Sequence, residues 1–124
     1  MEAGHLTHAT AREFLDVSLP EQGALGVFGA LHAAAVPVEL HVDFRDGVYA
    51  VMAAEVVAVA FGQTSPLALG DVAEILPQVR DLPNVRRLAL SVLTRVGQEN
   101  CAVPVDAVWR AGIADLKLRL EAAA

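Results

Sequence analysis

Cysteine, lysine and aromatic residues are scarce in this 124-residue sequence. The single cysteine, Cys101, excludes an internal disulfide, and nothing in the sequence points to an oxidising compartment. Residues 1–11 lack the basic and apolar regions of a signal peptide. The longest uncharged stretch, residues 22–38, is interrupted by glycines and a proline, so we expect it not to span a bilayer. These absences predict a cytoplasmic protein without a membrane segment.

Basic residues are also few, and they are unevenly distributed along the chain. The net charge is −6; residues 1–79 hold two basic and ten acidic side chains, whereas residues 80–124 hold seven basic and five acidic ones. An acidic chain is a poor binder of nucleic acid or of an anionic membrane surface, because both carry negative charge. We therefore expect neither a nucleic acid nor a membrane among its partners.

Small apolar residues are abundant: alanine occurs 23 times and valine 18 times, and apolar residues make up 55% of the chain. A chain of this size and composition can bury a core without disulfides or metals. No repeat and no linker divides it. We expect a flexible N-terminus over residues 1–11 and a single domain over residues 12–124.

A helix start is predicted at Ser18, which is followed by Pro20 and Glu21 in the pattern of a capping box. The spacing predicts a helix over Pro20–Ala35 that buries one bulky stripe. That stripe consists of Leu25, Phe28, Leu31 and Ala35. Beside it a second stripe of small residues would let another helix approach closely, as in a dimer interface. Its members are Gly26, Ala30 and Ala34.

Alternating residues from Val36 to Phe44 predict a half-exposed strand. Asp46-Gly47 is typical of a tight hairpin turn, and Val48–Ala53 is predicted as the returning strand. After a second reversal at Ala54-Glu55, Val56–Phe61 is predicted as a third strand. The fold class predicted is therefore α+β, with an antiparallel sheet of three or more strands packed by an N-terminal helix and two to three C-terminal helices.

Helices are predicted in the second half of the chain. Ser65-Pro66 starts one that runs to about Leu76, where Pro77 ends or kinks it. The apolar spacing favours a helix over residues 85–96, with a strand as the alternative, and a last helix from Pro104. Within that last segment, Leu116–Leu120 alternates and leaves a short strand open.

Glu39, His41 and Asp43 are the first candidates for chemistry, since the predicted strand places them on one face. Polar side chains on the outward face of a half-buried strand are expected in any case, and a straight row cannot surround a tetrahedral ion. These residues, with Cys101, form the alternative prediction of a small enzyme or ligand-binding domain. The main prediction contains no catalytic residue, no metal site and no cofactor.

Arg86 and Arg87 form the densest basic spot, which is expected to be either solvated surface or an anchor for an acidic protein partner rather than a nucleic-acid site. Aromatic residues for base stacking are not interleaved with them.

Residues 13–76 resemble a PATAN-type bacterial module. The resemblance rests on the run Phe14-Leu15-Asp16-Val17-Ser18-Leu19-Pro20, then Val38–Val42, then Val56–Gly62 before another helix; Val36-Pro37 replaces the usual glycine before the first strand. Such modules accompany signalling domains and have no known catalytic residues, so the resemblance implies an interaction role. A Roadblock-type GTPase regulator is the second family considered, and strands at residues 85–93 and 116–120 would favour it.

We predict a non-catalytic protein-interaction or signalling adaptor that forms a homodimer. Gly26, Ala30 and Ala34 are its predicted interface, and Arg86 and Arg87 its predicted anchor.

Overall fold

The computed structural model describes residues 9–35, 44–63, 74–96 and 107–122, and these ranges consist of helices joined by short turns. No strand is present in those four ranges, so the predicted α+β fold with its antiparallel sheet is wrong. Residues 9–13 are helical, and the remaining elements follow in chain order: η1 (Phe14–Ser18), α2 (Leu19–Gln22), α3 (Ala24–Ala35), α4 (Phe44–Ala60), α5 (Leu76–Arg80), α6 (Val85–Val96) and α7 (Ala107–Ala122).

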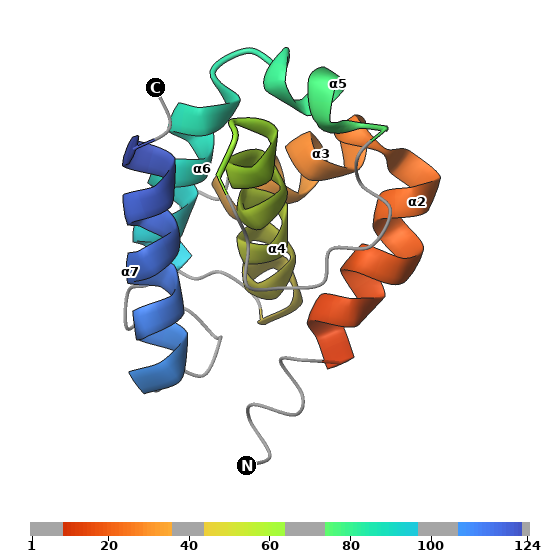
Figure 1. Ribbon diagram of the computed structural model, residues 1–124. Helices are drawn as coiled ribbons and strands as arrows, with labels where there is room; N and C mark the ends of the chain where they lie inside the picture. Colours follow the sequence, from red (N-terminus) through yellow and green to blue (C-terminus); the bar gives the residue numbers. More distant parts are fainter. Residues whose placement is uncertain (1–8, 36–43, 64–73, 97–106, 123–124) are drawn as a thin grey trace.

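Helix α4 runs through the centre of the molecule. Every residue from Ala50 to Ala58 is buried, and the helix packs against η1, α3, α5, α6 and α7. Figure 1 shows α6 and α7 on one side of it, η1 and α2 on the other, and α5 across one end. A helix that is apolar on all sides is stable only inside a core, and small side chains let the surrounding helices come close.

Burial on all sides explains why the predicted strands are wrong. Val48–Ala53 and Val56–Phe61 both fall within or at the end of α4, and Asp46-Gly47 lies in its first turn instead of forming a hairpin. A continuously apolar segment shows no period, so a buried strand and a buried helix look alike in sequence. The intrinsic preference of valine for strands is weak, and packing against several helices outweighs it in α4. The predicted first strand lies outside the described residues apart from Phe44, where α4 begins.

The helix start predicted at Ser18 is also wrong. The chain is already helical at residue 9, Ser18 has helical dihedral angles, and its side chain makes no capping hydrogen bond. Pro20 therefore stands inside a continuous helical segment, where it cannot donate a backbone hydrogen bond. The preceding turn is a π-helix in which the Leu19 N–H donates to the Phe14 carbonyl, five residues back. Widening of this kind accommodates a proline within a helix.

Gly23 separates α2 from α3. Its φ of 61° and ψ of −139° lie where residues with a side chain are strained, and its N–H donates to the Leu19 carbonyl at 2.7 Å. The predicted helix Pro20–Ala35 is thus two helices that meet at this residue.

The helices predicted in the C-terminal half agree better with the structure. The helix predicted over residues 85–96 is confirmed as α6, and Val85, Ala89, Val92, Leu93 and Val96 face the core. Helix α7 continues through Gly112, and its Ile113, Leu116 and Leu120 are buried, so the strand alternative at Leu116–Leu120 is wrong.

Pro77 lies in the first turn of α5, where a missing N–H costs nothing, rather than at the end of a helix. Most of the helix predicted before it, from Ser65, lies outside the described residues.

Candidate functional site

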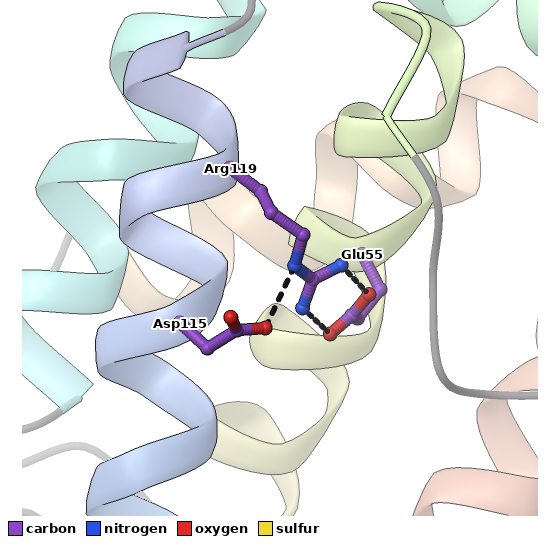
Figure 2. A network of polar contacts seen from close by, with 3 residues as sticks. All are labelled: Glu55, Asp115 and Arg119. Atoms are coloured by element: carbon purple, nitrogen blue, oxygen red, sulfur yellow. Dashed lines mark hydrogen bonds and ion pairs between the residues drawn. The ribbon is translucent and has the colours of Figure 1, made fainter.

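An ion-pair network joins α4 to α7 inside the molecule. The Arg119 guanidinium donates to both carboxylate oxygens of Glu55, at 2.8 Å from Nη2 and 2.9 Å from Nη1, and its Nε donates to Asp115 at 2.9 Å. Figure 2 shows the Arg119 side chain reaching from α7 to α4, with Asp115 one turn earlier on α7. Glu55 is 5% exposed and is the one buried charged residue among those described.

The electrostatics of this network follow from its geometry. The hydrogen bonds to Glu55 raise the pKa of Arg119 above its already strongly basic value; desolvation opposes this shift, and the charge of Glu55 adds to it. A bidentate pair with little solvent access is strong, but the two ions also lose their hydration. Since its charged groups face each other, the network orients α7 on α4, and we assign it a structural role.

A second polar cluster ties the N-terminal helix to the start of α4. The Tyr49 hydroxyl donates to the Glu13 carboxylate and accepts a hydrogen bond from Arg45 at 3.0 Å, while Arg45 pairs with Glu13 at 2.8 Å. The hydrogen bond to Tyr49 raises the pKa of Arg45, and the charge of Glu13 acts in the same direction. The Phe14 ring packs against Tyr49 with centroids 5.1 Å apart. This cluster also has a structural explanation.

Arg86 and Arg87, the predicted anchor, have different environments. Arg86 donates from Nε to the Leu120 carbonyl at 2.8 Å and from Nη2 to the Glu121 carbonyl at 3.5 Å, so it caps the free carbonyls at the end of α7. Arg87 is exposed on α6. Arg86 is thus half-buried and bound to α7, whereas Arg87 is exposed, and the role of the two as an anchor stays a prediction.

The predicted interface stripe on α3 faces the interior of the chain. Gly26 and Ala34 are buried, and Ala30 is half-buried against the core. A Cβ at Gly26 would lie 2.9 Å from the Gln22 Cβ, so glycine is needed there by the chain's own packing. The stripe therefore has a role within one molecule, and its role between molecules stays a prediction.

The opposite side of α3 is exposed, a surface that the sequence pattern does not reveal. Leu25 is 74% exposed, Gly29, His32 and Ala33 are exposed, and the half-buried Phe28 packs its ring on His32 with centroids 5.0 Å apart. We call these five residues the outer α3 face. Leu25 and Phe28 are predicted on a buried stripe, because α3 has no charged residue to mark which side meets water.

The outer α3 face is unusual in chemistry as well as in exposure. Among the helices with described bounds, α3 alone has no Asp, Glu, Lys or Arg. A solvated helix face normally carries charged side chains, and an exposed face without them is typical of a surface that meets another protein.

The remaining predicted site residues cannot be placed. Glu39, His41, Asp43 and Cys101 lie outside the described residues. Within the described ranges no group of three or more His, Cys, Asp or Glu residues could hold a metal ion. None of the described helices combines the length and apolar character needed to cross a bilayer.

Comparison with known proteins gives no match: no family model, no curated protein and no solved structure is significantly similar to this chain. Residues 85–93 and 116–120 are helical, so the strands that would favour a Roadblock-type regulator are absent from these two segments. The PATAN-type resemblance stays a prediction.

Proposed function

We propose that this chain is a non-catalytic protein-interaction module that works as a homodimer joined through the outer α3 face. The observation that carries the proposal is an exposed helix face without Asp, Glu, Lys or Arg. Leu25, in the first turn of α3, is 74% exposed on this face. Burying an exposed leucine side chain in a contact removes apolar surface from water, which stabilises the contact by about 1.5 to 3 kcal/mol. An interaction module of this kind is also what the resemblance to PATAN-type modules implies.

Charge limits where two copies of this chain can meet. Each chain has a net charge of −6, so two copies repel each other wherever their acidic surfaces meet. The outer α3 face has no Asp, Glu, Lys or Arg side chain of its own, so a contact confined to it places none of these charges opposite each other.

Sedimentation velocity over a dilution series tests this proposal. We expect reversible conversion between one and two chains of 13.0 kDa, and Leu25→Glu should leave a monomer with an unchanged circular dichroism spectrum. The matched control is Leu118→Glu, because Leu118 is also an exposed leucine, 65% accessible, but lies on α7. It should dimerise as the natural chain does. A natural chain that stays monomeric at every concentration, or equal loss of dimer in both variants, would overturn the proposal.

A further inference from the structure

We draw no further inference here: the strongest candidate, the surface cluster of Glu13, Arg45 and Tyr49 that ties the N-terminal helix to the start of α4, joins segments whose apolar side chains are already buried together in the core, so it belongs to the structural role described above.

Discussion

Gly26 and Gly29 stand three residues apart on α3 and have opposite surroundings. A Cβ at Gly26 would lie 2.9 Å from the Gln22 Cβ, whereas one at Gly29 would meet no atom of the described residues within 4 Å. The close contact at Gly26 arises where the chain turns between α2 and α3, with Gly23 at a positive φ. One glycine is thus required by the fold, and the other is free to serve a contact outside it.

Alanine substitutions should separate these two roles. Gly26→Ala should lower the free energy of unfolding by about 1 to 3 kcal/mol, because the Gln22 Cβ sits on the backbone side of its side chain and cannot swing away. Gly29→Ala is the matched control in the same helix, and at concentrations where the chain is monomeric it should raise the free energy of unfolding by up to about 1 kcal/mol. Urea denaturation measures both. Equal shifts in the same direction would refute the assignment.

At the scale of the element, α7 is oriented on α4 by the pair of Glu55 and Arg119. The two residues are 64 positions apart in sequence, and the Arg119 side chain is 14% exposed. Buried ion pairs add little net stability compared with apolar residues, and in some proteins they favour one packing of the helices over others. We attribute the register of α7 to this pair.

Removing one ion of the pair should be costly. Glu55→Gln removes the buried carboxylate from the largely buried Arg119 guanidinium, which keeps its hydrogen bond to the exposed Asp115, and we expect a loss of about 3 kcal/mol in the free energy of unfolding. The control is Asp115→Asn, which alters the other carboxylate on the same guanidinium; Asp115 is 63% exposed, so the change should stay within about 0.5 kcal/mol.

The double variant Glu55→Met with Arg119→Met removes both ions together and should recover most of the lost stability, because no charge is then left buried without its partner. Denaturant midpoints measure all of these variants. If the double variant loses as much stability as the single variants Glu55→Met and Arg119→Met lose when their effects are added, the assignment is contradicted.

The raised pKa of Arg119 gives a prediction for alkaline pH. Stability from a basic group with a raised pKa is present at lower pH and is lost only as pH rises through the folded-state pKa. Arginine therefore stays charged throughout the usual range, whereas the lysine in Arg119→Lys loses its proton from about pH 10 upward. The difference in free energy of unfolding between the natural chain and Arg119→Lys should widen above that pH. A constant difference up to about pH 11 would argue against a charged pair.

How far the sequence predicts these elements depends on charge. Helices α6 and α7 are predictable because Arg87 and Asp115, among other polar residues, mark the solvent side of each apolar stripe. From the sequence, helix α4 cannot be distinguished from a pair of strands, because apolar residues occupy all sides of the helix and their spacing shows no period. Glu55 inside it is expected in a turn, since nothing near it in sequence reveals that its partner is Arg119.

The same reasoning applies to the candidate site at the scale of the whole molecule. The sequence predicts self-association through the first long helix, but on Gly26, Ala30 and Ala34, which face inward. Only the packing of α3 against α4 and α6 determines which side of an uncharged helix remains outside. The role of Arg86 as a helix cap is likewise invisible in the sequence, because the end of α7 lies 34 residues further along.

Salt distinguishes the outer α3 face from a charged interface in the intact protein. Two chains that each carry a charge of −6 repel, and added salt screens this repulsion without weakening an uncharged contact. An interface built on Arg87 and an acidic surface would instead weaken as its attraction is screened.

The most direct measurement is the dissociation constant of the natural homodimer, determined by sedimentation equilibrium at about 0.05 M and about 0.5 M sodium chloride, where the screening length falls severalfold. Pairing through the outer α3 face predicts a lower dissociation constant, and so a tighter dimer, at the higher salt concentration. A dimer that loosens with salt, or a chain that is monomeric at both, would contradict it.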